Sequence, residues 1–196
     1  DSRGVMSSRR ELDAYKEQFA VDYAMLERAG VTETSPLPEL ISKLGITTLV
    51  GLSGQPGIFN EDVMAALLGN TDRPIVFALS NPSQLCEADP SMLLQRSHGR
   101  ALVATGSPSD DVLVEGKKVP VAQGNNAFIF PGLGLGALAA GVAHIPETLI
   151  LRAAQALSSY TAHAGDGTAL FPPTSELEAV AQVVALEVMA AAADLG

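Results

Sequence analysis

The chain has 196 residues, of which 47% are hydrophobic and only 17% are charged. It is therefore long enough to bury one sizeable core and too apolar for a disordered segment, while none of its apolar runs reaches membrane-spanning length. The net charge of −10 argues against nucleic acid as a partner, because proteins that bind nucleic acid favour basic stripes.

The cysteine content and the first residue bear on the cellular setting. Cys86 is the single cysteine, so an internal disulfide is excluded and a reducing compartment such as the cytoplasm is expected. Nothing beside Cys86 in the sequence suggests an activated nucleophile, and we interpret it as a partly buried thiol. The chain begins with Asp1 rather than Met and shows no signal peptide, so we expect it to be a piece of a longer polypeptide.

The first 104 residues predict alternating helices and strands. An amphipathic helix is expected over Arg9–Arg28, and a second helix begins at Ser35-Pro36 and ends at Gly45. Further helices begin at Asn60 and at Asp89-Pro90. Between the helices lie three apolar runs with strand character: Ile46–Val50, Pro74–Leu79 and Ala101–Ala104. This alternation predicts an α/β fold, a Rossmann-like doubly wound parallel sheet that lacks its first strands.

The rest of the chain predicts a hairpin and then a helical region. Val112–Val121 has a turn at Glu115-Gly116-Lys117, and the predicted helices that follow are Gly132–Ala143, Glu147–Tyr160 and Ser175–Leu195. We expect one domain over residues 1–196, with a sheet portion at 1–121 and a substrate-loop and helical portion at 122–196. Gly132-Leu133-Gly134-Leu135-Gly136 is a lone glycine string that helix packing explains better than phosphate binding.

Small and polar residues follow each of the three predicted strands. These segments are Gly51–Gly57, which contains Ser53 and Gly54, Ser80-Asn81-Pro82-Ser83, and Thr105-Gly106-Ser107-Pro108. Ligands bind outside the carboxyl ends of parallel strands, where glycines let a ligand approach the backbone and Ser or Asn side chains offer neutral hydrogen bonds. Three such ends on one edge favour a ligand crevice over ordinary turns.

Asn125 and Asn126 open the most apolar helical region, and two interpretations of this pair stand side by side. Two amides at a buried helix entrance require partners, which suggests an anion site that would bind a carboxylate. A simple asparagine cap followed by a turn explains the same residues. His98, His144 and His163 have no metal-ligand spacing, and we expect none of them to bind a metal.

The ordered set of motifs resembles that of the malic enzymes. The residues within these motifs are most similar to those of the bacterial long-type branch. The residues that carry the resemblance are DSRG at 1–4, GLSGQPGIF at 51–59, RPIVFALSNPS at 73–83, GRALVATGSP at 99–108, AQGNNAFIFPGLGLG at 122–136 and LFPP at 170–173. The resemblance implies an NAD(P)-binding domain of an oxidoreductase that converts malate to pyruvate and CO₂ while reducing NAD(P)⁺. The usual G-x-G-x-x-G fingerprint is absent here and is expected just upstream of Asp1.

The same resemblance assigns the cofactor residues. Asp1 would hold the adenosine ribose, and Lys16, assisted by Arg3, would lie near the 2′-phosphate of NADP, which gives a leaning toward NADP over NAD. A solvated lysine on an amphipathic helix is the alternative for Lys16. Ser53 and Gly54 would line the cofactor crevice.

The substrate residues implied by the resemblance follow the second and third strands. Ser80 and Asn81 would sit by the nicotinamide and malate. Asn81, Asn125 and Asn126 would contact the carboxylate and hydroxyl of malate or the nicotinamide amide.

The catalytic lysine, the catalytic tyrosine and the ligands of Mg²⁺ or Mn²⁺ are expected before Asp1, so this chain would contribute no catalytic and no metal-binding residue. The partners implied are malate and pyruvate, in a homodimer or homotetramer. A malolactic enzyme, which retains NAD and yields lactate, is one alternative. A non-catalytic nucleotide-binding remnant is another, if the natural chain starts near Asp1.

Overall fold

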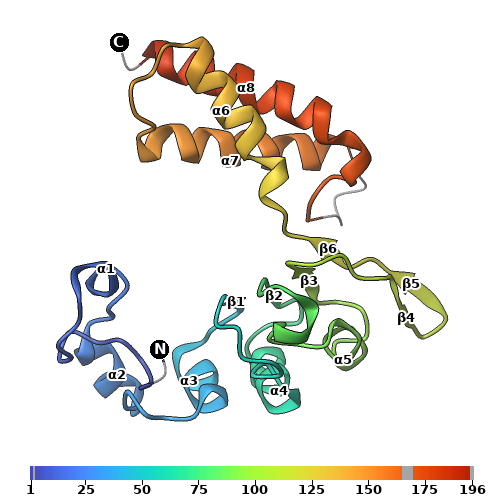
Figure 1. The fold of residues 1–196 in the computed structure, drawn as a ribbon. Helices are drawn as coiled ribbons and strands as arrows, with labels where there is room; N and C mark the ends of the chain where they lie inside the picture. The colour runs from blue at the N-terminus through green and yellow to red at the C-terminus, as the bar shows by residue number, and fades with distance from the viewer. Residues whose placement is uncertain (2, 165–169, 195–196) are drawn as a thin grey trace.

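A four-stranded parallel sheet forms the centre of the computed structural model, which describes residues 1, 3–164 and 170–194. Its strands are β1 (Thr48–Gly51), β2 (Ile75–Ala78), β3 (Leu102–Thr105) and β6 (Ala122–Gln123), in the order β1-β2-β3-β6 (Figure 1). The three predicted strands are confirmed. β6 was not predicted because it has only two residues, too few for a periodic pattern.

Helices α3 (Leu37–Leu44), α4 (Glu61–Asn70) and α5 (Pro90–Arg96) cover one face of this sheet. Alternate residues of β2 show which face it is, because Val76 and Ala78 are fully buried whereas Ile75 and Phe77 are partly exposed. The main core therefore joins the three helices to the sheet. Its largest fully buried apolar side chains are Ile41, Met64, Leu67, Leu93 and Leu94.

The opposite face of the sheet is met by the C-terminal part of the chain. The ring centroid of Phe171 lies 6.1 Å from that of Phe77, and Phe171 stacks on Phe128 at 5.9 Å. Figure 1 shows the C-terminal helices on the other side of the sheet from α3, α4 and α5. The α/β class with a parallel sheet is confirmed, and the described helices that cover the sheet directly lie on one face of it.

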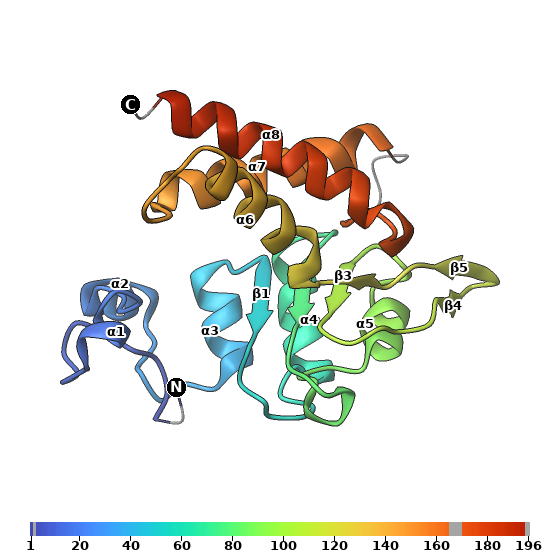
Figure 2. The same cartoon turned by 45° about the horizontal axis from the view of Figure 1, so that its top comes forward.

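The N-terminal segment departs from the prediction. The expected single helix over Arg9–Arg28 is wrong, because two short helices stand there: α1 (Ala14–Glu17) and α2 (Tyr23–Ala29). The side chains of Asp13 and Asp22 accept hydrogen bonds from the backbone N–H groups of Lys16 and Ala24, and so each begins a new helix. Both views place this segment beside α3, at the β1 side of the molecule (Figures 1 and 2).

Two short antiparallel strands form the predicted hairpin. β4 (Val112–Val114) pairs with β5 (Lys117–Val119), and Glu115 and Gly116 between them have φ angles of 50° and 80°. Positive φ at both turn residues suits the right-handed twist of a two-residue hairpin. The predicted hairpin is therefore confirmed. Short 3₁₀ turns complete the elements at Ser83–Leu85 (η1), Asn126–Phe128 (η2) and Thr174–Glu176 (η3).

The C-terminal helices α6 (Phe130–Ala139), α7 (Glu147–Ala164) and α8 (Leu177–Asp194) surround a second core. A Cβ at Gly132 would lie 2.6 Å from the carbonyl oxygen of Ala181, and one at Gly136 would lie 2.7 Å from that of Ala185. These two glycines therefore let α6 approach the backbone of α8, which confirms helix packing as the role of the glycine string. None of the helices in the described part of the chain is long and apolar enough to cross a membrane.

Candidate functional site at the carboxyl ends of the strands

The ends of β1, β2 and β3 meet at one edge of the sheet. Gly51 pairs with Ala78, and Ala78 pairs with Thr105. Beyond these pairs the Leu79 N–H donates a hydrogen bond to the Gly51 carbonyl at 2.9 Å, and the Gly106 N–H donates one to the Ala78 carbonyl at 3.2 Å. The three polar segments predicted to share an edge are thus neighbours in space.

Two glycines make the close approach of these segments possible. A Cβ at Gly106 would lie 2.2 Å from the carbonyl oxygen of Leu79, and one at Gly124 would lie 2.8 Å from the Leu79 side chain. The Gly124 N–H also donates to the carbonyl of Thr105 at 2.9 Å. The segment that leads to Asn125 is therefore attached to the end of β3, beside the other strand ends.

Ser53, Gly54 and Ser80 are joined by a residue that the sequence analysis missed. Glu87 is fully buried, and its Oε1 accepts hydrogen bonds from the Ser53 N–H at 2.7 Å, the Gly54 N–H at 3.1 Å and the Ser80 hydroxyl. The Gly54 N–H also donates to the Ser80 hydroxyl oxygen at 2.9 Å. The loops after β1 and β2 thus share one carboxylate.

The environment of Glu87 keeps it ionised. Burial by itself raises the pKa of a carboxyl group, but the hydrogen bonds from the Ser80 hydroxyl and from backbone N–H groups, including those of Ser53 and Ser80, outweigh burial and lower the pKa of Glu87 from 4.5 to about 2. Glu87 is therefore an anion at neutral pH, surrounded by donors that belong to the two loops. A glutamate between Cys86 and Ala88, four residues after the polar Ser80–Ser83 segment, was the signal available in the sequence.

Asn81 is oriented by a partner from the end of β3. The Ser107 hydroxyl donates to Asn81 Oδ1 at 2.6 Å, and Asn81 itself is exposed. With its oxygen engaged by Ser107, the carboxamide offers its Nδ2 as a hydrogen-bond donor. The structure thus brings Asn81 into the group of strand ends, next to Ser80.

Asn125 and Asn126 are exposed, so the expectation of amides at a buried helix entrance is wrong. Asn125 Oδ1 accepts a hydrogen bond from the Ala127 N–H at 2.9 Å and so caps η2, as the cap interpretation predicted. Helix α6 begins only at Phe130, four residues beyond Asn126. The binding role of the pair stays a prediction.

The predicted adenosine-end residues form a separate group in the N-terminal segment. The Arg10 guanidinium donates to both carboxylate oxygens of Asp1, at 2.9 and 2.8 Å, a contact that the sequence analysis missed. Lys16 Nζ lies 3.8 Å from Asp1 Oδ2 and 3.7 Å from Asp13 Oδ2. Arg3 is exposed and contributes its backbone N–H to Asp1 Oδ1 at 3.0 Å.

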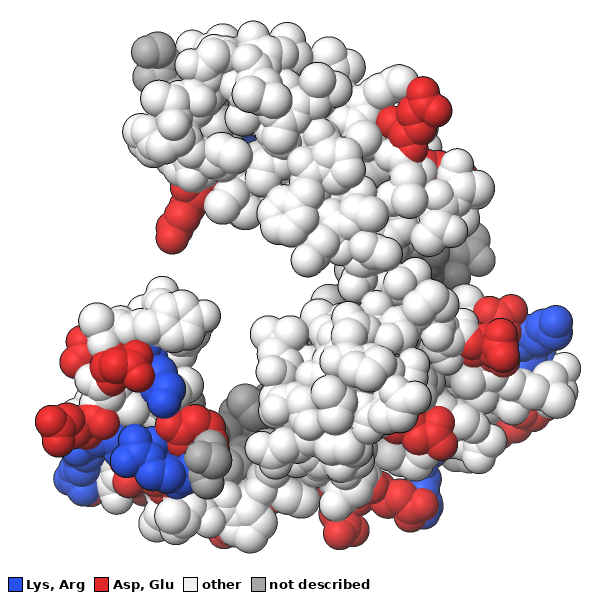
Figure 3. Space-filling view, in the orientation of Figure 1, with Lys and Arg blue, Asp and Glu red and all other residues white. Residues whose placement is uncertain are grey.

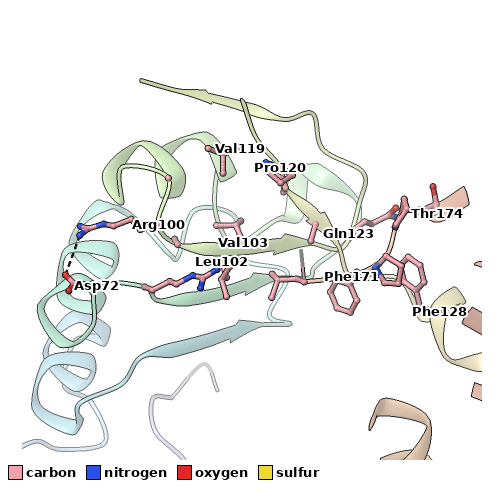
Figure 4. Close-up of a pocket in the computed structure, with 18 residues that line it drawn as sticks. Asp72, Arg100, Leu102, Val103, Val119, Pro120, Gln123, Phe128, Phe171 and Thr174 are labelled. Carbon is pink, nitrogen blue, oxygen red and sulfur yellow. Dashed lines mark hydrogen bonds and ion pairs between the residues drawn. The ribbon is translucent and has the colours of Figure 1, made fainter. Parts of the chain in front are cut away.

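Two cavities differ in chemistry and in place. A cavity of about 420 Å³ lies at the strand ends, and its walls include Ser80, Cys86, Thr105 and Ser107. A larger cavity of about 740 Å³ extends along β3 and β6 from Arg100 to Phe171 (Figure 4), and the described residues that line it include none of the predicted site residues. The smaller one fits a ligand site better, because it is at the carboxyl edge where parallel sheets bind ligands.

Comparison with known proteins shows the family of this chain. A sequence model described as "Malic enzyme, NAD binding domain" matches residues 1–193. The chain belongs to the malic enzyme family. It is 44% identical over 162 residues to an NAD-dependent malic enzyme of Sodalis glossinidius (strain morsitans), which covers 82% of this chain and 29% of that relative.

Two further malic enzymes extend the comparison. The NAD-dependent malic enzyme of Shewanella sediminis (strain HAW-EB3) is 41% identical over 84% of this chain and 30% of its own length. The NAD-dependent malic enzyme 2 of Vibrio vulnificus (strain YJ016) is 40% identical over 76% of this chain and 26% of its own length. The chain thus spans less than a third of the curated relatives that it matches.

The dinucleotide and the divalent metal that the resemblance implies fit this chain differently. The strand ends suit a dinucleotide, since glycines bring the backbone close and Ser53, Ser80 and Asn81 offer neutral polar groups. Among the described residues, no group of three or more His, Cys, Asp or Glu side chains could hold a metal ion.

Proposed function

We propose that this chain is the NAD-binding part of a malic enzyme that oxidises malate and releases CO₂ and pyruvate. The observation that carries the proposal is the junction of Ser53, Gly54 and Ser80 at the carboxyl edge of the sheet, with Asn81 beside them. The family match over residues 1–193 gives the chemistry that such an edge would serve. The ligands of Mg²⁺ or Mn²⁺, and the acid and base, would come from the rest of the complete protein.

The chain's own residues would bind and orient the reactants. NAD⁺, when bound, accepts the hydride from C2 of malate. Asn81 would donate from Nδ2 to the carboxylate or hydroxyl of malate, because Ser107 already engages its oxygen. Asn125 and Asn126 are exposed beside the end of β3 and would complete the same pocket. Held in one geometry, cofactor and substrate react without first losing their freedom of orientation.

We propose NAD rather than NADP as the preferred cofactor, which reverses the leaning drawn from Lys16. The Nζ of Lys16 lies between the carboxylates of Asp1 and Asp13, so its charge is already shared with two anions. A carboxylate such as Asp1 accepts a hydrogen bond from a ribose 2′-hydroxyl and repels a 2′-phosphate. The relatives described above are named as NAD-dependent enzymes.

The decisive measurement is steady-state malate oxidation by the complete protein, with NAD⁺ and NADP⁺ compared and the product identified. We expect pyruvate, stoichiometric NADH, a higher kcat/KM with NAD⁺, and loss of turnover when EDTA removes the divalent metal. Lactate without net NADH would show a malolactic enzyme instead. No turnover with either cofactor in the presence of Mn²⁺ would favour a non-catalytic nucleotide-binding protein.

We also propose that the complete protein forms a homodimer or homotetramer in the cytoplasm. Apolar side chains on the C-terminal helices are exposed, among them Leu138 at 83% and Leu186 at 66%. Figure 3 shows few charged side chains over these helices on the face drawn. Light scattering of the purified protein measures its mass, and a monomer at micromolar concentration would contradict the proposed assembly.

A further inference from the structure

We propose that Glu87 is a positioning residue of the cofactor site, which fixes the loops after β1 and β2 in the arrangement that NAD meets. The proposal rests on the proposed function, because it assigns those loops to the dinucleotide. Glu87 itself is fully buried. It would act through Ser53, Gly54 and Ser80 rather than by touching the cofactor.

The hydrogen bonds of Glu87 bridge the two loops. Oε1 accepts from the N–H and the hydroxyl of Ser53, at 2.7 and 3.1 Å, and from the N–H of Gly54 at 3.1 Å. The Ser80 hydroxyl donates to the same oxygen, and the Ser80 N–H donates to Oε2 at 3.3 Å. One carboxylate therefore accepts from donors at both strand ends, so a shift of either loop would leave the buried Glu87 anion without part of its hydrogen bonds.

The backbone around Glu87 is attached to the far end of the first loop. The Phe59 N–H donates to the Glu87 carbonyl at 2.9 Å, and the Gly57 N–H donates to the Cys86 carbonyl at 3.3 Å. The segment 86–87 thus holds the Gly51–Phe59 connection at both its beginning and its end. Such double attachment is what keeps a loop at a ligand site in one conformation.

Gly51 leaves the space that the Glu87 side chain occupies. A Cβ at Gly51 would lie 2.7 Å from Glu87 Cγ, 2.8 Å from Cδ and 2.9 Å from Oε2. A side chain at position 51 would therefore push the carboxylate off its donors while Glu87 itself stayed in the sequence. This gives a second, independent way to disturb the same contact.

The charge of Glu87 is balanced by dipoles. Within the described residues, no Lys, Arg or His side chain forms an ion pair with it, and its donors are N–H groups and hydroxyls of the loops. A glutamine at this position offers one acceptor oxygen instead of two, and its NH₂ would face the Ser80 N–H. Glu87→Gln would thus keep the shape of the side chain but disturb the arrangement of the loops after β1 and β2.

The test uses the complete protein and measures NADH binding by fluorescence together with steady-state kinetics. We expect Glu87→Gln and Gly51→Ala each to raise the Kd for NADH and the KM for NAD⁺ about tenfold, equivalent to about 1.4 kcal/mol. The matched control is Leu94→Ala, which removes a fully buried side chain of the same core without touching either loop. It should lower the thermal midpoint at least as much and leave both cofactor constants unchanged.

The result that overturns the proposal is a lower thermal midpoint in Glu87→Gln or Gly51→Ala with cofactor constants within about twofold of wild type. An equal loss of NADH affinity in Leu94→Ala would overturn it too, since general destabilisation would then suffice. If Glu87→Gln does not fold, Gly51→Ala decides by the same readouts. Wild-type malate turnover tests the proposed function separately, because the role of Glu87 is tested by the ratio of the cofactor constants of the variant to those of wild type.

Discussion

Asn81 carries the clearest residue-level prediction of the site. Asn81→Ala removes the donor proposed for malate while the fold keeps its core, because Asn81 is exposed. We expect kcat/KM for malate to fall about 100-fold, the size of a hydrogen bond to a charged group. Circular dichroism should show an unchanged fold. Kinetic constants equal to those of wild type would remove Asn81 from the site.

Ser107 tests whether the orientation of Asn81 matters. The Ser107 hydroxyl holds Asn81 Oδ1 at 2.6 Å, whereas the hydroxyl of Ser109 contacts only the Asp110 carbonyl among the described residues, at 3.4 Å. Ser107→Ala should raise the KM for malate about fivefold, because the freed carboxamide can rotate away, and Ser109→Ala should leave it unchanged. Equal effects of the two substitutions would show that Asn81 does not depend on Ser107.

A substitution of Lys16 distinguishes a residue that contacts the cofactor from a solvated surface lysine. Because the Lys16 ammonium group is already shared between the carboxylates of Asp1 and Asp13, Lys16→Gln should leave the ratio of NADP⁺ to NAD⁺ activity within about twofold of wild type. A fall in this ratio of about fivefold would instead place the ammonium group near a 2′-phosphate. Lys43→Gln, at an exposed lysine in the last turn of α3, is the control. A cofactor ratio unaffected by Lys16→Gln would leave Lys16 as a surface residue only.

Side chains that act by contact across the fold were the part of the site that sequence reasoning could not supply. Ser53, Ser80 and Asn81 were predicted as site residues because they follow apolar strands, a relation that is local in sequence. Glu87 and Arg10 escaped because their roles depend on partners in other segments. Asn125 and Asn126 were placed in the right neighbourhood but given the wrong burial, since a nearby apolar helix does not bury its preceding loop.

At the level of elements, strands β1, β2 and β3 and the hairpin were predictable, whereas the two-residue strand β6 and the N-terminal helices were not. Apolar runs bounded by glycine or polar residues leave few alternatives to a buried parallel strand. In the N-terminal segment a helical period coexists with Asp13 and Asp22, whose side chains bind backbone N–H groups two or three residues ahead. Each aspartate starts a new helix. The hydrophobic pattern of residues therefore runs through two short helices and resembles that of one long helix.

The glycines of α6 give a matched pair of substitutions. Gly136→Ala would place a Cβ 2.7 Å from the carbonyl oxygen of Ala185 in α8, so we expect a loss of about 1–3 kcal/mol in the free energy of unfolding. Gly134 has no atom within 4 Å of such a Cβ, and Gly134→Ala should stabilise the helix by about 0.5–1 kcal/mol. Urea denaturation measures both, and the same sign for the two substitutions would contradict close packing of α6 on α8.

Charge is unevenly distributed over the molecule as a whole. On the face drawn in Figure 3, acidic and basic side chains gather over the N-terminal segment and the lower part of the molecule, whereas the C-terminal helices are mostly uncharged. Several ion pairs of the molecule are exposed to solvent, such as Arg9 with Glu27 and Arg100 with Asp72. Exposed pairs add little to stability. The acid sensitivity of the fold should therefore depend more on buried carboxylates than on these pairs.

Glu87 is the carboxylate for which this acid sensitivity has a definite sign. Its pKa is about 2 in the folded protein and 4.5 as an ordinary glutamate, so the unfolded chain binds a proton between these values while the folded chain does not. The stabilisation from Glu87 is fully present above pH 4.5 and is lost as the pH falls toward 2. One proton contributes a slope of at most about 1.36 kcal/mol per pH unit.

The free energy of unfolding, measured by urea titration from pH 6 downward, tests this directly in wild type and Glu87→Gln. Wild type should lose stability more steeply below pH 4.5 than the variant, because glutamine has no proton to take up and every other group titrates in both proteins. The difference between the two curves should therefore shrink as the pH falls. Parallel curves over this range would mean that the folded and unfolded states bind the same number of protons at Glu87, so that the fold does not lower its pKa. The stabilisation of the Glu87 anion by the two loops would then be contradicted.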